Sequence, residues 1–396
     1  MGVHALYVHM PFCRSRCPYC DFFSCALGAR GSDAQAGAYL DMVCARIDEL
    51  GSIGVLDHLR CGYIGGGTPS LFGPALAGAV ARIRRWCEPV EITCEANPES
   101  CTASFCSAIA RAGATRISLG VQSLIDEELA VMGRIHTRER ALCAIEIARA
   151  TGMSVSCDLM CGLPGQTADS WERTLLDVIE AAPDHISVYP LSIEPGTPFE
   201  RRCARDAHLV PDEDLQADLM IAARAMLREA GFEPYEVASY ARSGHACLHN
   251  IAYWTAKSYA AIGPSAAAMF SVDEFTRYRE AFPGVEPGPR AARVRLRQRD
   301  ARGRSFEAEF LDERETVAED LMLGMRMSAG IGAGLLDRAR TTLGDAALTR
   351  ALESALEGGL ASWSRVGRDE RLVPTERGWL FGNELYGLMW DLAADG

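Results

Sequence analysis

The chain of 396 residues lacks several features that mark other classes of protein. No segment offers the roughly 18 uninterrupted apolar residues that a membrane-spanning helix needs. Residues 1–25 do not combine a basic start with a long apolar run, so we expect no signal peptide. There is little positive charge: Lys257 is the only lysine, and the net charge of −13 argues against a general binder of nucleic acid or anionic membranes.

Cysteine is abundant, but no cysteine follows Cys247. In a chain of this length without a secretion signal, the fifteen cysteines indicate reduced thiols rather than a disulfide framework. We therefore expect a cytoplasmic protein. Its hydrophobic content of 48% and charged content of 23% are ordinary for a globular protein. The length predicts one large domain and a smaller one.

Three cysteines near the N-terminus form a compact motif. Cys13, Cys17 and Cys20 have the spacing C-x-x-x-C-x-x-C, which lets one loop present three thiolates to one inorganic centre. Thiolates select iron–sulfur clusters, zinc or copper(I). Structural zinc and ordinary electron-transfer clusters usually take four protein ligands, so three cysteines favour a four-iron cluster with one iron open to a small molecule. The alternatives are a zinc knuckle completed by Cys25 or a histidine, or three free thiols.

Short β-rich runs alternate with helical stretches from residue 1 to about 240, which indicates parallel βαβ units. Six repeats favour a partial (βα)6 barrel over an open nucleotide-binding sheet. The expected strands are Ala5–His9, His58–Ile64, Val90–Glu95, Arg116–Val121, Ser154–Leu159 and His185–Leu191. The distinctive polar residues fall at or just after these strands, at the end of a parallel barrel that carries the chemistry.

We divide the chain into a barrel over residues 1–270, a connector over 271–312 and a C-terminal domain over 313–396. In the last part, three short helices, two extended pieces and a final helix over Glu376–Asp391 resemble a small α+β winged-helix module. Such modules often bind DNA, which requires positive charge to neutralise phosphates. Residues 310–396 instead carry fifteen acidic side chains against nine basic ones, so we expect a lid or a docking surface.

A glycine-rich segment, Gly65-Gly66-Gly67-Thr68, directly follows the second expected strand. Three glycines let backbone N–H groups approach a charged ligand, and Thr68 adds a hydroxyl group. A phosphate cradle is the obvious alternative, but the lysine of a P-loop is absent.

Further polar residues lie at the later strand ends or in the loops after them, namely Glu95, Gln122, Arg134 and Asp158. An acid, an amide, a guanidinium and a second acid at one barrel mouth suit a ligand with its own ammonium, carboxylate and ribose hydroxyls. The two carboxylates could instead be the acid and base of a hydrolase. Neither a nucleophile nor a complete set of metal ligands accompanies them.

Taken in order, these segments resemble the radical S-adenosylmethionine (SAM) family of oxygen-independent coproporphyrinogen III oxidases and their relatives. The resemblance covers residues 7 to about 270 and includes Tyr-Val-His-Met-Pro-Phe-Cys, Gly-Gly-Gly-Thr-Pro-Ser, Glu-Ala-Asn-Pro-Glu, Gly-Val-Gln-Ser, Gly-Arg-Ile-His-Thr and Asp-Leu-Met-x-Gly-Leu-Pro-Gly-Gln-Thr. It implies an α/β fold, a partial (βα)6 radical SAM barrel, with a 4Fe-4S cluster, bound SAM and an electron donor that reduces the cluster.

The resemblance also implies the roles of individual residues. Cluster ligands would be Cys13, Cys17 and Cys20. The SAM site would be lined by Tyr7, Gly66, Gly67, Thr68, Glu95, Gln122, Arg134 and Asp158.

Two subgroups of this family differ near the cluster. The oxidase carries an extra cysteine two residues after its third cluster cysteine and has a longer N-terminal extension. Here that position is Phe22, and six residues precede Tyr7, as in the HemW-type heme chaperone. One segment departs from the chaperone pattern: Ser265-Ala-Ala-Ala replaces the usual Gly-Ala-His-Ser and is closer to the oxidase.

His249-Asn-Ile-Ala-Tyr-Trp254 resembles the His-Asn-x-x-Tyr-Trp motif of the chaperone. Imidazole is a common axial ligand of heme iron, so the resemblance implies that His249 contacts heme. A hydrogen-bonded structural histidine is the alternative.

The expected function is therefore a radical SAM heme chaperone that carries heme and delivers it to recipient hemoproteins such as respiratory enzymes. Two alternatives remain. The first is an enzyme, an oxidoreductase that decarboxylates coproporphyrinogen III in heme biosynthesis. The second is a zinc-structured binding protein without radical chemistry.

Overall fold

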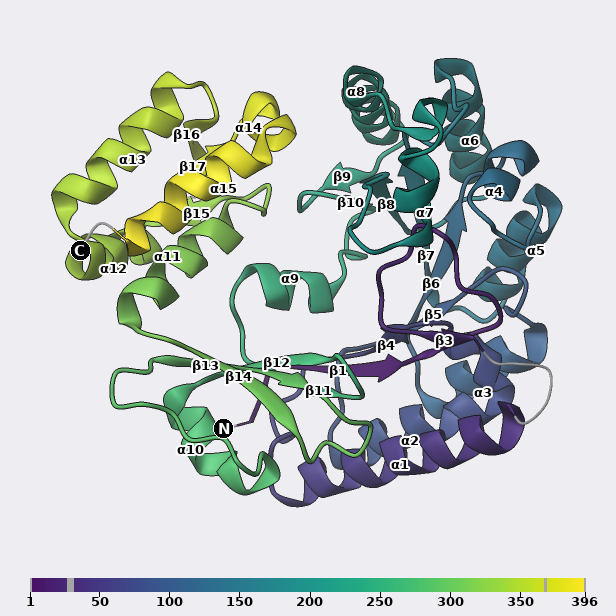
Figure 1. The fold of residues 1–396 in the computed structure, drawn as a ribbon, viewed down its shortest axis with the longest axis horizontal. Coiled ribbons are helices and arrows are strands. Elements are labelled where there is room, and N and C mark those ends of the chain that lie inside the picture. Colours follow the sequence, from purple (N-terminus) through teal and green to yellow (C-terminus); the bar gives the residue numbers. More distant parts are fainter. Residues whose placement is uncertain (1, 27–31, 367–368, 395–396) are drawn as a thin grey trace.

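The computed structural model describes residues 2–26, 32–366 and 369–394 (Figure 1). Its main body is a 12-stranded sheet in the order β14-β13-β12-β11-β1-β4-β5-β6-β7-β8-β10-β9. Six consecutive strands of this sheet are parallel and follow the chain order, which confirms the predicted α/β class and the six repeats. They are β1 (Ala5–Met10), β4 (Cys61–Gly66), β5 (Glu91–Ala96), β6 (Arg116–Gln122), β7 (Ser154–Cys161) and β8 (His185–Pro190).

Helices cover the outside of the parallel strands (Figure 1). They are α1 (Ser32–Ser52), α2 (Ala77–Trp86), α3 (Ala103–Ala112), α4 (Asp126–Val131), α5 (Arg138–Arg149), α6 (Ala168–Glu180), α7 (Pro198–Cys203) and α8 (Glu213–Glu229). Helix α6 shows why they pack there: Trp171, Leu175 and Val178 recur at helical spacing and are buried. Its start is fixed by Thr167, whose side chain accepts a hydrogen bond from the N–H of Ser170.

The inside of the barrel is polar, unlike the apolar layers that usually fill a parallel barrel. Successive residues of a strand point to opposite faces, so β6 presents Arg116, Ser118 and Gln122 to an internal cavity. The residues between them, Ile117, Leu119 and Val121, are buried in the hydrophobic core. A polar interior leaves room for a ligand in the barrel.

Beyond β8 the chain closes the barrel at its lower end, by which we mean the N-terminal ends of the parallel strands. Helix α9 (Leu248–Trp254) lies against β4 there, and Leu248 and Ala252 pack with Ala5 and Cys61, the first residues of β1 and β4. The other elements of this stretch are β9 (Glu233–Pro234), β10 (Ser239–Ala241), β11 (Tyr259–Ile262) and β12 (Ala267–Ser271).

The segment over 271–312, expected as a connector, adds to the sheet. It contains α10 (Val272–Tyr278) and the antiparallel hairpin of β13 (Arg293–Gln298) and β14 (Phe306–Leu311). Strand β13 pairs with β12, so the hairpin extends the sheet of the barrel.

The C-terminal part has a hydrophobic core of its own, separate from that of the barrel. Its elements are α11 (Glu313–Gly324), β15 (Ile331–Gly332), α12 (Ala333–Leu343), α13 (Asp345–Glu357), β16 (Ala361–Val366), β17 (Asp369–Pro374), α14 (Glu376–Leu380) and α15 (Gly382–Trp390). The expected final helix is divided at Phe381, and the short strand β15 was not expected; it pairs with β17. Across the described ranges, none of the helices has both the length and the apolar character needed to cross a membrane.

Candidate functional site

A cavity of about 320 Å³ lies inside the barrel and reaches the C-terminal ends of the parallel strands. Ten of the twelve predicted site residues line it: Cys13, Cys17, Cys20, Gly66, Gly67, Thr68, Glu95, Gln122, Arg134 and Asp158. The structure therefore brings together residues that are spread over more than 140 positions of the sequence. The two others, Tyr7 and His249, are not among the lining residues.

The three predicted cluster cysteines share one loop at the upper end of this cavity. Cys13 ends the short strand β2 (Phe12–Cys13), which pairs with β3 (Cys25–Ala26), and the N–H of Cys20 donates to the carbonyl oxygen of Cys17 at 3.2 Å. Burial raises the pKa of the Cys13 thiol and that of Cys20, the latter to about 11. Loading with metal must therefore release protons from these thiols.

The arrangement of thiols distinguishes between the possible metal groups. Nowhere in residues 2–26, 32–366 and 369–394 do three His, Cys, Asp or Glu side chains lie together as ligands of one metal ion. Cys25, which would have completed a zinc knuckle, is exposed on β3. A four-iron cube differs from zinc because each cysteine binds a different iron, so the thiols need not converge on one point. Three thiols on one cavity wall fit the cube.

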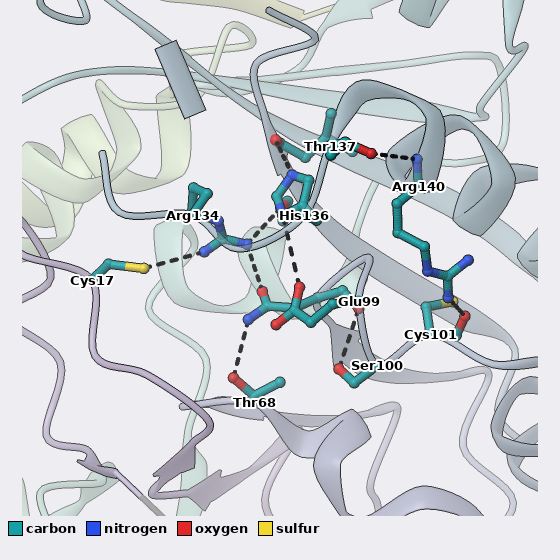
Figure 2. Close-up of polar contacts among 12 residues, drawn as sticks. Cys17, Thr68, Glu99, Ser100, Cys101, Arg134, His136, Thr137 and Arg140 are labelled. Carbon is teal, nitrogen blue, oxygen red and sulfur yellow. Dashed lines mark hydrogen bonds and ion pairs between the residues drawn. The ribbon is translucent and has the colours of Figure 1, made fainter. Parts of the chain in front are cut away.

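Arg134 connects the cysteine loop to the ends of β5 and β6 (Figure 2). Its Nη1 donates to Sγ of Cys17 at 3.5 Å, and its Nη2 donates to Oδ1 of Asn97 at 2.9 Å and to the carbonyl oxygen of Gly120 at 2.8 Å. Asn97 in turn donates from Nδ2 to Oγ1 of Thr68 at 3.2 Å. A guanidinium is thus fixed where the negative charge of a thiolate-ligated cluster would lie.

The loops that carry Asn97 and Arg134 are held together by two further contacts (Figure 2). Oε2 of Glu99 lies 3.7 Å from Nδ1 of His136, and Arg140 donates to the carbonyl oxygen of Cys101. The loop after β5 and the segment after α4 therefore face each other over several residues. This pairing positions Asn97 and Arg134 in the cavity wall.

The glycine-rich segment has a role that differs from the expected one. The N–H groups of Gly67 and Thr68 donate to the carbonyl oxygens of Met10 and Phe12 at 2.8 and 2.7 Å, and so hold the start of the cysteine loop. These two N–H groups are occupied, so their expected role as ligand donors is not supported. Gly66 has a φ of +109°, and a Cβ there would lie 2.4 Å from Nδ1 of His9. Only glycine fits this position.

The two predicted carboxyl groups are half-buried in the cavity wall. Glu95 accepts from the hydroxyl of Tyr63 at 2.7 Å and from the N–H of Gly66 at 2.9 Å, and burial raises its pKa to about 7. Asp158 accepts from the hydroxyl of Ser118 at 3.1 Å, and burial also raises its pKa. Carboxyl groups of this kind suit hydrogen bonds to an ammonium or a hydroxyl of a bound ligand.

Tyr7 and His249 lie behind the cavity wall. The hydroxyl of Tyr7 is 3.0 Å from Nδ1 of His9, and the ring of His249 stacks on Tyr63 with 4.8 Å between centroids. The His249 side chain is only 3% exposed, and neither ring nitrogen has a hydrogen-bond partner among the described residues. Burial, with a smaller effect of Arg116, lowers the pKa of His249 to about 3, so the imidazole is neutral.

Several lining residues were not predicted. Asn97 stands two positions after Glu95 in the Glu-Ala-Asn-Pro-Glu segment and could have been found by that position. Arg116, His185 and Asn250 also line the cavity. Arg116 begins an expected strand, where the period of two places it on the same face as Gln122, but no motif marks it.

Comparisons with known proteins agree with this geometry. Residues 7–178 match the Radical SAM superfamily. The heme chaperone HemW of Mycobacterium tuberculosis is 34% identical over 359 residues, which cover 87% of this chain and 88% of that protein. The mitochondrial radical S-adenosyl methionine domain-containing protein 1 of Bos taurus is 37% identical over 334 residues, or 83% of this chain and 74% of that protein. Coproporphyrinogen III oxidase from Escherichia coli, at 19% identity, superposes over 98% of this chain and 90% of its own with a TM-score of 0.77, which shows a shared fold.

Proposed function

This chain belongs to the radical SAM superfamily and, within it, to the HemW family, and from that membership we propose that it binds heme and delivers it to recipient hemoproteins. The observation that carries the proposal is the 34% identity to a heme chaperone over 87% of the chain, a share too large for the barrel alone. The oxidase shares the fold at much lower identity. Phe22, where the oxidase pattern has a cysteine, is exposed beside the cluster loop and lines the cavity.

We propose that Cys13, Cys17 and Cys20 hold a 4Fe-4S cluster and that the cavity holds SAM. When bound, this pair supplies one-electron reductive cleavage of a sulfonium and thereby radical chemistry. The protein's own residues position these groups and exclude water from them. In this proposal the SAM site consists of Tyr7, Gly66, Gly67, Thr68, Glu95, Gln122, Arg134 and Asp158.

We further propose that His249 contacts heme after α9 has moved. A neutral imidazole is the form that ligates iron. The two buried ring nitrogens without partners cost free energy in this conformation, which favours a second state in which they are bound. Movement of α9 must break the hydrogen bonds at its two ends. Glu91 accepts from the N–H groups of Leu248 and His249 at 3.1 and 3.4 Å, and Trp254 donates to Glu236 at 3.0 Å.

A heme titration followed by visible absorbance tests this proposal. We expect His249→Ala to lose the heme spectrum, whereas His245→Ala, which changes a more exposed histidine outside the cavity, keeps it. Equal binding by the two variants would remove His249 from the site. Heme transfer from the loaded protein to a heme-free b-type respiratory enzyme tests delivery. Transfer no faster than from free heme would contradict the chaperone role.

An assay of oxidase activity distinguishes the second candidate function, coproporphyrinogen III oxidation, from the chaperone role. The reconstituted protein is incubated anaerobically with dithionite, SAM and coproporphyrinogen III, and protoporphyrinogen and 5′-deoxyadenosine are measured together. We expect deoxyadenosine without the porphyrin product. Formation of protoporphyrinogen would identify an oxidase.

The proposed location is the cytoplasm, and the proposed partners are recipient hemoproteins and an electron donor for the cluster. Fifteen cysteines in a chain of this length support a reducing compartment. We propose the C-terminal part as the surface that docks heme or its recipient. It contacts the barrel through Trp379, which donates to the carbonyl oxygen of Val237 at 2.7 Å, and it exposes Trp363 and Trp390.

A further inference from the structure

Two buried thiols lie in contact where the chain passes from β5 to α3. Sγ of Cys101 is 3.4 Å from Sγ of Cys106, and both side chains are fully buried. Within the described residues, no other two cysteines are in hydrogen-bond contact through their sulfur atoms. Neither thiol lines the cavity, and the proposed roles of the cluster and SAM residues do not use them.

The start of α3 explains why the two residues meet. Cys101 stands directly before Thr102, the N-cap of α3, and Cys106 is the fourth residue of that helix. Side chains at these two positions commonly pack together and fix the angle at which the chain enters a helix. Many apolar side chains could make this contact. Two thiols can in addition form a covalent bond.

A metal site does not account for the pair. Cys94 in β5 and Cys143 in α5 are the other thiols nearby. Even so, the part of the chain that the structure describes has no place where three His, Cys, Asp or Glu side chains lie together as ligands of one metal ion. A structural zinc site takes four ligands. The chemistry that two adjacent thiols share is oxidation to a disulfide.

The surroundings make one thiol of the pair more reactive than the other. The hydrogen bond with Cys101, together with the charge of Arg140, lowers the pKa of the Cys106 thiol against the opposing effect of burial. The same hydrogen bond and burial raise the pKa of Cys101. Arg140 is close because it donates to the carbonyl oxygen of Cys101 (Figure 2). The thiolate is the form that attacks an oxidant, so Cys106 is the attacking thiol and Cys101 the resolving one.

Burial limits the kind of oxidant that can react. Both thiols are shielded from solvent, so a bulky disulfide such as oxidised glutathione has no access to them. Hydrogen peroxide is close to water in size and reaches buried groups through small local openings of the fold. The pair is therefore suited to a small peroxide.

We propose that Cys101 and Cys106 are a peroxide-sensitive pair whose disulfide displaces the loop that holds Arg134. The thiolate of Cys106 attacks one oxygen of hydrogen peroxide: an S–O bond forms, the O–O bond breaks, and the released hydroxide takes up the proton that Cys106 has lost. The sulfur of Cys101 then attacks the sulfenic sulfur. The S–S bond forms, and the oxygen leaves as water with the proton of Cys101. The two sulfur atoms lose two electrons, which reduce one peroxide to two waters.

The disulfide acts on the cluster end of the cavity through the backbone. The sulfur atoms must approach from 3.4 Å to about 2.05 Å, and Cys101 is the residue that moves, because it lies in a loop whereas Cys106 lies in a helix. The N–H of Cys101 donates to the carbonyl oxygen of Asn97 at 3.0 Å. Asn97 accepts from Arg134, which also contacts Cys17 (Figure 2). Movement of Cys101 therefore disturbs the turn that positions Asn97.

Differential thiol labelling of the wild-type protein tests the bond. The full chain, with and without reconstituted cluster, is exposed to hydrogen peroxide and denatured. Free thiols are blocked with one reagent, disulfides are reduced, and the new thiols are marked with a second reagent. We expect mass spectrometry to find the second label on Cys101 and Cys106 together, and oxidised glutathione to leave both without it. An unchanged pair, a disulfide with Cys94 or Cys143 instead, or equal oxidation by glutathione overturns the proposal.

Hydrogen exchange then measures the effect on the loop. Amides over 97–101 should exchange about fivefold faster in the oxidised wild type, as expected for loss of one hydrogen bond, and should recover after reduction with dithiothreitol. Cys106→Ala, which removes the sulfur without burying a new polar group, should show no change with peroxide. Cys143→Ala is the matched control, because Cys143 is exposed on α5, and it should respond as the wild type does.

Equal exchange in the oxidised and reduced wild type overturns the proposal, and so does a response that survives Cys106→Ala. If that variant does not fold, the labelling and the exchange of the wild type decide. Neither measurement involves heme or SAM, so the result stands apart from that of the heme-binding tests.

Discussion

At the cluster end of the cavity, Glu95, Asn97 and Arg134 each have at least two hydrogen-bond partners, whereas at the lower end the guanidinium of Arg116 and the ring of His249 have none among the described residues. A satisfied network holds its members in one geometry, which suits a cofactor that must be oriented. Buried groups without partners cost free energy. The side chains at the cluster end are therefore held in one geometry. Those at the lower end leave polar atoms available to a ligand.

Helix α9 connects the lower end to the C-terminal part. Its first residues are held by Glu91, and Trp254 at its other end donates to Glu236 and lies 5.0 Å from the guanidinium of Arg326. Arg326 also lies 4.4 Å from the ring of Tyr386 in the C-terminal core. Any displacement of α9 must therefore disturb contacts with both parts.

The largest expected effect is loss of the iron–sulfur cluster when a thiol at the cluster end is removed. Alanine at Cys13, Cys17 or Cys20 should abolish the cluster, because a four-iron cube held by three cysteines loses one of its three protein ligands. Visible absorbance and iron content after anaerobic reconstitution measure this. Cys25→Ala is the control, since Cys25 is exposed on the adjacent strand and should leave the cluster intact. Loss of the cluster in that variant would favour a four-cysteine centre.

A change at Gly66 tests how rigid the cluster end is. Gly66→Ala should lower the free energy of unfolding by about 4 kcal/mol, because a strained backbone and a clash with His9 add together. Gly152→Ala is the matched control: its φ is +78°, but a Cβ there meets nothing within 4 Å, so about 1 kcal/mol is expected. Urea unfolding compares the two. Equal losses would mean that the segment after β4 adapts and is no rigid frame.

The raised pKa of Glu95 makes the free energy of unfolding depend on pH. Burial raises this pKa from 4.5 to about 7, so the native protein without ligands holds the proton up to a higher pH than the unfolded chain does. The free energy of unfolding should therefore fall as the pH rises from about 4.5 to about 7, by on the order of 3 kcal/mol. Urea unfolding of the wild type and of Glu95→Gln across this range measures it. The variant should lack this part of the slope, and the exposed Glu88→Gln should retain it.

The difference between the cluster end and the lower end also explains which features could be predicted from the sequence. Strand positions and the cluster end were predictable because Cys13, Thr68 and Glu95 stand at strand ends in segments with distinctive spacing. The lower end was not, because Arg116 lies inside an ordinary strand and its lack of partners depends on where α9 passes. His249 was found by its motif, but its burial follows from packing between distant segments, which neither spacing nor period reveals.

The smallest expected change in the free energy of unfolding follows from a substitution at His249, and it is a gain rather than a loss. His249→Phe keeps a ring in the stack with Tyr63 but removes two buried nitrogens without partners, so the free energy of unfolding should rise by about 1 kcal/mol. Heme binding should be lost in the same variant. His185→Phe is the matched control, because both nitrogens of His185 are hydrogen-bonded, to Ser156 and Tyr235, and its loss should destabilise by about 1–3 kcal/mol. If both variants lost stability equally, His249 would be an ordinary structural histidine. A gain in stability with a loss of heme would show that the lower end retains His249 for its ligand at a cost to the fold.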